Sequence, residues 1–506
     1  MPIEYIGDDI VVVRRDNGST WELYWGDPVH RFAERDVPPT NPAKKETGKL
    51  RIATVDREGN QVLGFIRGDV KLVSSSVLRF SMIDVQQGDG MIIETPAGKV
   101  IFIDGGDNKL FARHASARYP ATTNAKPLVV DAMIITHGDA DHFAGLTDLK
   151  RSESDTRPGK AIFVVPERIY HNGLVKRPGE HPDKTKRKDV DMFGAHNKGP
   201  NELEYATELV DDPRTVSEAE RNEPFNTWCK TIDHWDQRAQ RVLGKPIEIR
   251  RIDQHSDGFL PFIITEGLSV ELLGPIVEQV GGAPALPFLR DPPDDANLLL
   301  GDREPTKKGS YSASHTVNGH SINIRLVYKN VRFLMTGDMN QEAMARLRRE
   351  LPTADLTSEI LKAPHHGSAD FDLAFLKTVK PVVSLISSGD ESLAKEHIHP
   401  RATMLSALGK VSRDPFGIIF NTELAAFFKY RGPSVDQEPG DKEEASYEGF
   451  ERTNFGIIHV RTNGERVLTF THSGKKGMNE AYRFTVAADE SVTFAKQVTK
   501  IGAPAA

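Results

Sequence analysis

The segment IITHGDADHFAG, residues 134–145, places two histidines and two aspartates within six positions, directly after an apolar run. Imidazole nitrogens and carboxylate oxygens are common protein ligands of divalent metal ions. His137 and Asp139 stand two residues apart, and Asp141 and His142 are adjacent, so the loop can present one pair to each of two ions. A capping turn before a helix would explain one aspartate, but it would leave both histidines unexplained. The spacing therefore predicts a metal site.

Three further apolar runs end in residues of the same chemical kinds. VIFIDGG carries Asp104, VRFLMTGD ends in Asp338, and EILKAPHHGS carries His365 and His366. Each motif is weak evidence when taken alone, because short motifs of this kind also occur by chance. The combination of four strand-end loops with histidine or aspartate in one chain is nevertheless strong evidence for a metal site.

The pattern of strands and helices divides the chain into parts. Residues 1–75 carry short β-branched and aromatic runs between Gly, Asn and Pro signals, which predict a small all-β domain, of the SH3-like kind. Over residues 76–430, two strand-rich halves with helices predict a layered α/β sandwich, with a long polar insert at about 172–265. The acidic segment 431–449 predicts a linker or loop, and the β-rich residues 450–506 are expected to complete the α/β domain.

Length and composition exclude several classes of protein. A chain of 506 residues exceeds one usual hydrophobic core, so two or three domains are expected. The net charge of −7 argues against wrapping of nucleic acid by the whole molecule, but leaves a local basic groove open. The single cysteine, Cys229, excludes an internal disulfide and a cysteine-rich zinc module. The acidic start without an apolar run, and the lack of long apolar stretches, predict a cytoplasmic protein without a signal peptide or membrane partner.

The order of the motifs DGG, HxDxDH, TGD and PHHGS resembles the metallo-β-lactamase fold. Residues 84–106, 136–145 and 453–467, together with LKAPHHGS, are similar to the hydrolase (nuclease) domain of the competence protein ComEC, with Gln86 where that branch has glycine. The resemblance covers about residues 77–470, and it includes neither the N-terminal unit nor a membrane channel. It implies an αβ/βα sandwich, with a site for two metal ions at one edge and hydrolase activity.

The resemblance also implies two ligand pairs that share one carboxylate. His137 and Asp139 would bind the first ion, and Asp141 and His142 would bind the second. Asp338 would bridge the two ions. We therefore count Asp141 and Asp338 among the catalytic residues as well as among the metal ligands.

Four further residues receive supporting roles from the same resemblance. The PHHG motif favours His366 as the final ligand, with His365 beside it as a supporting residue or a substitute. Asp104 would orient ligands from behind the site. The fold's usual third histidine on the first ion is harder to place; His171 is the candidate, and a histidine in a surface loop is an equally good interpretation.

Hydrolysis by metal-activated water is the chemistry expected of such a site. His399, in HIHP together with His397, would protonate a leaving group or bind a phosphate; the alternative is a loop histidine with local contacts. Asp139 stands where the familiar pattern has a histidine. Because a carboxylate is a harder ligand than imidazole, it favours Mn²⁺ relative to a His-rich zinc site and suits phosphodiester oxygens. We therefore expect two divalent ions, Zn²⁺ or Mn²⁺.

Three functions remain open at the level of the sequence. The resemblance favours a phosphodiesterase or nuclease acting on DNA, weakly supported by Lys176, Arg177 and the run KTKRK at 184–188, although such a run more often marks a solvated loop. The alternative is a small-molecule hydrolase for an ester, lactone or phosphorylcholine-type substrate. A third interpretation is an interaction protein whose N-terminal β domain binds a protein partner and whose hydrolase domain is inactive, but the intact ligand set argues against it.

Overall fold

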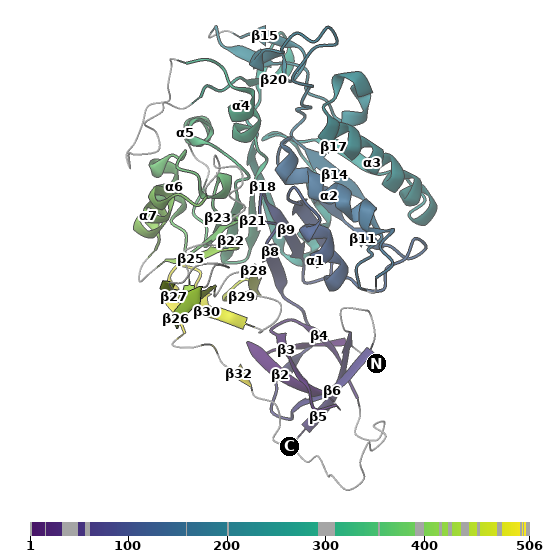
Figure 1. The fold of residues 1–506 in the computed structure, drawn as a ribbon, viewed down its shortest axis with the longest axis vertical. Helices are drawn as coiled ribbons and strands as arrows, with labels where there is room; N and C mark the ends of the chain where they lie inside the picture. The colour runs from purple at the N-terminus through teal and green to yellow at the C-terminus, as the bar shows by residue number, and fades with distance from the viewer. Residues whose placement is uncertain are drawn as a thin grey trace.

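A small all-β unit at the foot of Figure 1 and a larger α/β body above it make up the computed structural model of the chain. No helix in the described part of the chain is long and apolar enough to cross a membrane. The structure describes residues 3–15, 17–32, 49–55, 61–157, 159–199, 202–291, 309–352, 355–389, 399–413, 417–423, 428–436, 445–452, 456–472, 478–495, 498 and 500–501.

The N-terminal unit is one sheet with the strand order β3-β2-β6-β5-β4-β1-β7. Alternating apolar side chains, such as Val11 and Val13, fill its core together with Ile6, Ile52 and Ile66. These strands give an all-β unit, whereas its SH3-like type stays a prediction. The strands are β1 (Ile3–Ile6), β2 (Ile10–Arg15), β3 (Thr20–Tyr24), β4 (Pro28–Arg31), β5 (Lys49–Val55), β6 (Gln61–Arg67) and β7 (Leu72–Val73), and β32 (Lys500–Ile501) pairs with β2.

The first sheet of the body has ten strands in the order β17-β14-β12-β10-β9-β8-β28-β29-β30-β31. Its central strands GMIIE and VIFID are buried along their whole length, as expected for apolar runs covered on both faces. The strands are β8 (Leu78–Met82), β9 (Gly90–Glu94), β10 (Val100–Asp104), β12 (Ala132–Ile134), β14 (Arg168–His171), β17 (Glu248–Arg251), β28 (Ile457–Thr462), β29 (Arg466–His472), β30 (Met478–Val486) and β31 (Val492–Phe494).

The second sheet of the body has six strands in the order β18-β21-β22-β23-β24-β25. Apolar side chains of the two sheets face each other and form a shared core, in which the rings of Phe80 and Phe333 lie 5.8 Å apart. The strands are β18 (Leu268–Gly274), β21 (Asn323–Tyr328), β22 (Val331–Met335), β23 (Ile360–Lys362), β24 (Val383–Ile386) and β25 (Ile418–Asn421).

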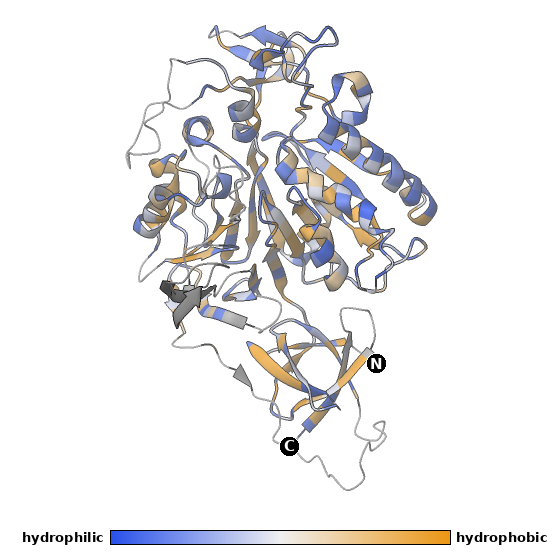
Figure 2. Ribbon diagram, viewed as in Figure 1, coloured by the Kyte–Doolittle hydropathy of each residue, from blue (hydrophilic) through white to orange (hydrophobic). Residues whose placement is uncertain are grey.

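Helices cover the outer faces of both sheets (Figure 1), so the body has helix, sheet, sheet and helix layers. Apolar residues run along the strands between these layers, whereas the outer side of α3 is hydrophilic (Figure 2). The predicted mixed α/β fold is thus confirmed. The helices are α1 (Leu110–Arg118), α2 (Ala140–Ser152) and α3 (Glu223–Val242) on the first sheet, and α4 (Ala313–Gly319), α5 (Gln341–Glu350), α6 (Leu373–Val379) and α7 (Ala402–Val411) on the side of the second.

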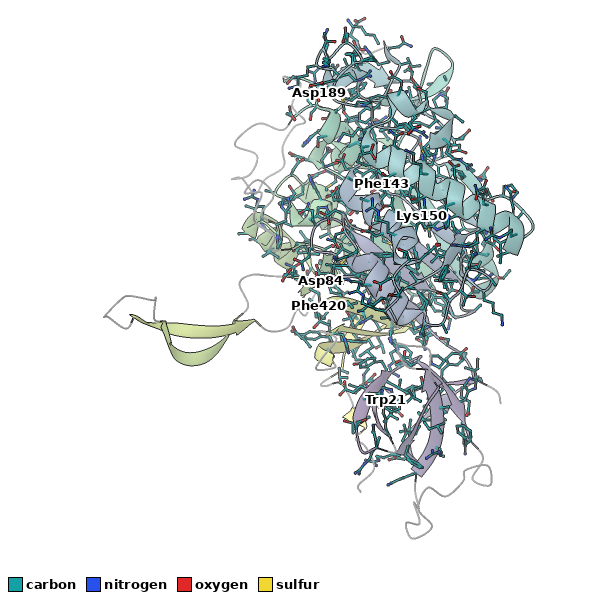
Figure 3. All side chains as sticks on the ribbon, turned by 45° about the vertical axis from the view of Figure 1, so that its right-hand side comes forward. Trp21, Asp84, Phe143, Lys150, Asp189 and Phe420 are labelled. Atoms are coloured by element: carbon teal, nitrogen blue, oxygen red, sulfur yellow. The ribbon has the colours of Figure 1, made fainter. Side chains whose placement is uncertain are left out.

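The insert predicted at about 172–265 contains α3 and part of a small sheet. Figure 3 shows Asp189 of this insert at the end of the molecule opposite Trp21 of the N-terminal unit. The strands of that sheet are β15 (His196–Lys198), β16 (Glu204–Ala206), β19 (Glu278–Val280) and β20 (Ala283–Pro287), and β11 (Leu128–Val130) pairs separately with β13 (Val164–Pro166).

The acidic segment predicted as a linker at 431–449 overlaps two paired strands. β26 (Phe428–Asp436) and β27 (Ala445–Arg452) run antiparallel, and Phe428 is opposite Arg452. Residues 437–444 between them lie outside the described part of the chain. The structure therefore has strands at both ends of the segment where a linker was expected.

Two parallel strand pairs determine where polar loops can meet. β10 pairs parallel with β12 in the first sheet, and β22 pairs parallel with β23 in the second. Parallel neighbours have their carboxyl ends at the same edge of a sheet, where ligand sites of α/β proteins commonly lie. The loops after these four strands therefore converge at one edge of the sandwich.

Candidate metal centre

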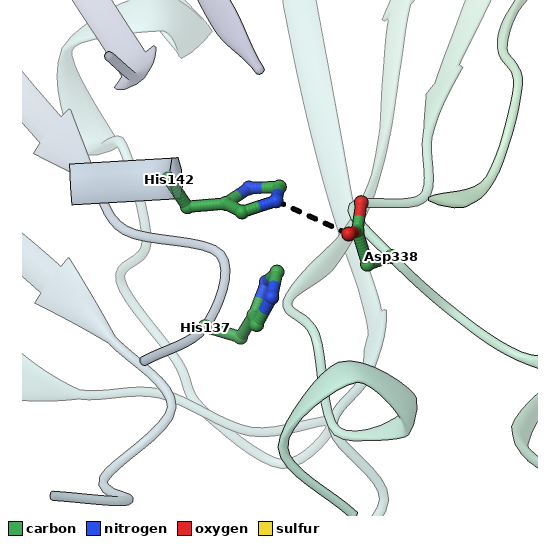
Figure 4. Close-up of side chains that lie close together, drawn as sticks. All are labelled: His137, His142 and Asp338. Carbon is green, nitrogen blue, oxygen red and sulfur yellow. Dashed lines mark ion pairs between the residues drawn. The ribbon is translucent and has the colours of Figure 1, made fainter. Parts of the chain in front are cut away.

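His142 lies in the first turn of α2 and is fully buried between two carboxylates. Its Nδ1 lies 2.8 Å from Asp104 Oδ2, and its Nε2 lies 3.2 Å from Asp338 Oδ2. Figure 4 shows His142 and Asp338 facing each other from the two halves of the sandwich, with His137 beside them. Asp104 also accepts hydrogen bonds from the Thr136 amide, at 2.8 Å, and from its hydroxyl, at 2.6 Å. Asp104 thus fixes the ring of His142 so that Nε2 points into the site.

His366 approaches the same carboxylate from the second sheet. Its Nε2 lies 3.0 Å from Asp338 Oδ2 and 3.8 Å from Asp141 Oδ2. Its Nδ1 lies 3.2 Å from the Ser387 carbonyl oxygen, which keeps Nε2 directed towards the site. Asp338 is therefore contacted by a histidine from each half of the molecule.

The donor atoms of this cluster are close enough to share an ion. One donor atom each from Asp141, His142 and His366 lie within 4.8 Å of one another, and the same holds for His137, His142 and Asp338. His142 Nε2, His366 Nε2 and Asp338 Oδ1 are buried and make no hydrogen bond within the described residues. Buried polar atoms without partners are rare and call for an explanation. The residues present fit a divalent ion at this position.

Burial and neighbouring charges shift the pKa values of these groups in opposite directions. Burial would raise the pKa of Asp338, but His366 and His142 outweigh it and hold that pKa well below its usual range. Burial would lower the pKa of His366, but Asp338 and Asp89 raise it to about 10. The cluster is therefore a concentrated set of charges inside the protein, as functional sites often are.

His137 belongs to the cluster as the neighbour of His142. Its ring centroid lies 4.0 Å from that of His142. Burial, followed by the neighbouring His142, holds its pKa well below the usual value, so the imidazole is neutral. Its Nδ1 lies 3.2 Å from the hydroxyl of Thr136 and 3.3 Å from the hydroxyl of Ser321.

Asp139 does not join the cluster, although it lies in the same loop. Its Oδ1 accepts a hydrogen bond from Lys176 Nζ at 2.7 Å. In the amide orientation that satisfies both of its polar atoms, the Asn318 nitrogen lies 2.9 Å from Asp139 Oδ2 and 3.2 Å from His137 Nε2. The carboxylate of Asp139 is thus occupied by protein donors.

The expectation that His171 is the third histidine of the first ion stays a prediction, and the structure shows what its ring contacts. His171 ends β14, but its Nε2 donates to the Asp211 carbonyl oxygen at 2.7 Å, and its Nδ1 accepts from the Gly173 amide at 3.2 Å. Both ring nitrogens are therefore used by the backbone of the insert. Burial lowers the pKa of His171 as well.

His365 and His399 lie beside the cluster without joining a ligand group of the described residues. The ring of His399 is 5.8 Å from His365 and 6.4 Å from His366. Burial, followed by His366, lowers the pKa of His399 to about 3. A ring that is neutral at physiological pH is poorly suited to donate a proton, which speaks against the acid role considered for His399. His397 lies outside the described residues.

Asp104, His365 and His366 adopt positive φ angles of 55°, 46° and 51°. Such a backbone is uncommon for residues other than glycine, costs on the order of 1–3 kcal/mol each, and clusters at functional sites. Three such residues at one edge support the assignment of this edge as the functional site.

Sequence reasoning missed two charged residues behind the cluster, Lys362 and Asp89. The Lys362 ammonium contacts the Asp89 carboxylate, and both side chains are fully buried. The available signal was a lysine inside the apolar strand EILKAP. Charged residues are almost never fully buried unless they are paired, so its partner had to be close.

The sequence was compared with known families and proteins. The profile of the Metallo-beta-lactamase superfamily matches residues 83–186, which include the loop at 137–142. A search of curated proteins finds no match.

Three solved structures show distant similarity. The metallo-beta-lactamase fold protein YhfI from Bacillus subtilis is 9% identical over 68% of this chain and 97% of its own, with a TM-score of 0.29. Zn²⁺-bound PqqB from Methylobacterium extorquens is 12% identical over 67% and 86%, with a TM-score of 0.30. A long form RNase Z from yeast is 8% identical over 83% and 50%, with a TM-score of 0.24.

The matched segment contains His137, Asp141 and His142, whereas Asp338 and His366 of the buried cluster lie outside it. Proteins of this superfamily are generally metal-dependent hydrolases. Over residues 83–186 the chain is thus similar to the Metallo-beta-lactamase superfamily.

Proposed function

We propose that this chain is a metal-dependent phosphodiesterase that cleaves DNA. The observation that carries the proposal is the position of Asp338 Oδ2, which lies 3.2 Å from His142 Nε2 and 3.0 Å from His366 Nε2. With Asp141 beside them, these residues give a mixed carboxylate and imidazole donor set. The two carboxylates make this set harder than one of imidazoles alone, and harder cations such as Mn²⁺ bind phosphate oxygens well.

An ion held by Asp141, His142, Asp338 and His366 would supply a water of lowered pKa and positive charge beside the phosphoryl oxygen. The chain's own residues determine the geometry around it. Asp104 orients His142 through Nδ1, and the Ser387 carbonyl does the same for His366. Such outer partners keep the ligand atoms directed to one point.

The choice of DNA rests on the motifs similar to the ComEC-type hydrolase domain and on the lysines of the insert. Lys184, Lys186 and Lys188 are exposed, whereas Arg187 pairs with Glu220 and is not available to a ligand. Exposed lysines attract a phosphate backbone through charge alone. The cytoplasmic location and a protein partner for the N-terminal unit stay predictions from the sequence.

The test is cleavage of plasmid and single-stranded DNA by the full chain with MnCl₂, next to Asp338→Asn, which keeps the side-chain shape. We expect nicked and shortened products that are absent with Asp338→Asn and after chelation by EDTA. Bis-p-nitrophenyl phosphate and an ester, p-nitrophenyl acetate, run in parallel. Metal-dependent turnover of the ester without cleavage of DNA or of the phosphodiester would replace this proposal by the small-molecule hydrolase.

A further inference from the structure

The polar atoms of the loop at 137–142 are used in two different ways. His142 Nε2, together with His366 Nε2, makes no hydrogen bond within the described residues and faces Asp338. Asp139, in contrast, has donors at both oxygens, with Lys176 Nζ 2.7 Å from Oδ1. His142 is thus available to a metal ion, whereas Asp139 is already paired with the ammonium group of Lys176.

Too few donors remain for a second ion on the His137 side. Catalytic metal sites use about three protein ligands and a water. His171 is occupied by the backbone, and Asp139 by Lys176 and Asn318. Among the described residues, His137 shares a ligand group with His142 and Asp338, and His142 also belongs to the group of Asp141 and His366.

Hydrogen bonds of the surrounding backbone hold Lys176 in place. Its carbonyl oxygen accepts from the Asn222 amide, the N-cap of α3, at 3.0 Å. The next residue, Arg177, is anchored: its amide donates to the Met192 carbonyl at 2.8 Å, and its buried guanidinium pairs with Glu208. The backbone that follows the Lys176 Cα is therefore held by hydrogen bonds to Asn222 and Met192.

Lys176 is also accessible to a substrate. About a quarter of its side chain is exposed (25%), as is a fifth of that of Asp139 (19%). A lysine ammonium has three donors, and one is used by Asp139, so two remain for phosphate oxygens. Lysine binds phosphate as a compact point charge.

We propose that the Lys176 ammonium takes the place of a second metal ion beside Asp139, and that the centre binds one divalent ion. This inference deepens the proposed function and replaces the expectation of two ions. Lys176 would contact a non-bridging oxygen of the substrate phosphoryl group and stabilise the charge that develops on it. Asp139 would then position Lys176 instead of binding metal.

The test is the number of Mn²⁺ ions bound by the full chain after EDTA treatment and titration with MnCl₂, read by calorimetry and by electron paramagnetic resonance. We expect about one ion for the native chain and for Lys176→Arg, and about two for Lys176→Ala, which frees Asp139. Lys184→Ala, an exposed lysine of the same insert, serves as the control and should stay at about one. Lys176→Met, closer in size to lysine, repeats the test should Lys176→Ala fold poorly.

Two ions in the native chain would overturn the proposal, and so would one ion in both folded Lys176→Ala and Lys176→Met. The count is independent of the substrate, so failure of the phosphodiesterase proposal leaves it interpretable. Turnover of bis-p-nitrophenyl phosphate gives a second readout. We expect Lys176→Ala to lose about 10²-fold in kcat, the usual effect of removing one such donor, and Lys176→Arg to retain more.

Discussion

The ammonium group of Lys362 contacts the carboxylate of Asp89, and neither side chain is exposed to solvent. Lys362 Nζ also donates to the Gly337 carbonyl at 2.8 Å and lies 3.5 Å from Asp338 Oδ1. Asp89 Oδ1 in turn lies 3.4 Å from His366 Nδ1. The pair therefore supports the two residues on which the proposed metal centre depends.

Replacing Lys362 by methionine should destabilise the protein strongly. The substitution leaves Asp89 buried without its cation, and breaking a buried pair from one side costs about 3–5 kcal/mol. The measurement is urea unfolding of the metal-free chain, so that a change in metal binding does not enter. The double variant Lys362→Met with Asp89→Asn serves as the control, because it removes the unpaired charge. It should lose less than the sum of the two single variants; strict additivity would contradict the pairing.

Asp104→Asn should weaken metal binding and leave the fold intact. The amide cannot orient His142 as the carboxylate does, and loss of such a partner typically costs about 10–100-fold in metal affinity. The measurement is the Kd for Mn²⁺ by calorimetry, with far-ultraviolet circular dichroism for the fold. Asp148→Asn, in the same helix as His142 and paired with Arg151, is the matched control. An unchanged Kd in Asp104→Asn would contradict the orienting role.

Substitution of His171 and substitution of His366 should have different effects on the number of Mn²⁺ ions that the protein binds. His366→Ala removes a proposed ligand and should abolish tight Mn²⁺ binding. His171→Ala should leave the number of ions unchanged but reduce the free energy of unfolding by about 1–3 kcal/mol, because the Asp211 carbonyl and the Gly173 amide lose their partner. Loss of an ion in folded His171→Ala would restore the original assignment of His171 as a ligand.

The positions of histidines and aspartates at the ends of strands predict the edge at which the site lies. They do not predict which partner each side chain contacts. Asp104, His142 and Asp338 were identified because each follows or flanks an apolar run, and the parallel strands β10, β12, β22 and β23 bring these ends together. His171 also stands at a strand end, in β14. Its ring is hydrogen-bonded to a carbonyl forty residues later in the insert, a contact that no local pattern encodes.

The same limit applies to Asp139 and Lys176, which are 37 residues apart in the chain. The exchange of histidine for aspartate was visible in the sequence and was interpreted as a change of metal preference. The structure instead provides a lysine as the partner of that carboxylate. A local motif thus predicts the type of donor well, whereas the partner depends on how the insert that carries Lys176 folds over the loop at 137–142.

Glu94 should make the stability of the protein sensitive to acid. Burial would raise its pKa, but Arg118 and Arg79 outweigh burial and lower it from 4.5 to about 2. Tyr119 also donates to it at 3.0 Å. A carboxyl whose folded-state pKa is lowered stabilises the fold above its unfolded-state pKa and loses this contribution as the pH falls through its folded-state pKa.

The expected window therefore extends from about pH 4.5 down to about pH 2, with a total on the order of 3 kcal/mol from this group. The measurement is the free energy of unfolding against pH for the native chain and for Glu94→Gln. Glu94→Gln should be less stable at pH 7, because Arg118 loses its charged partner, and its stability should fall less steeply below pH 4.5. Glu180→Gln, in the exposed hairpin of the insert, is the control and should follow the native curve. Parallel curves for the native chain and Glu94→Gln would show that the ion pair does not couple folding to protonation of Glu94.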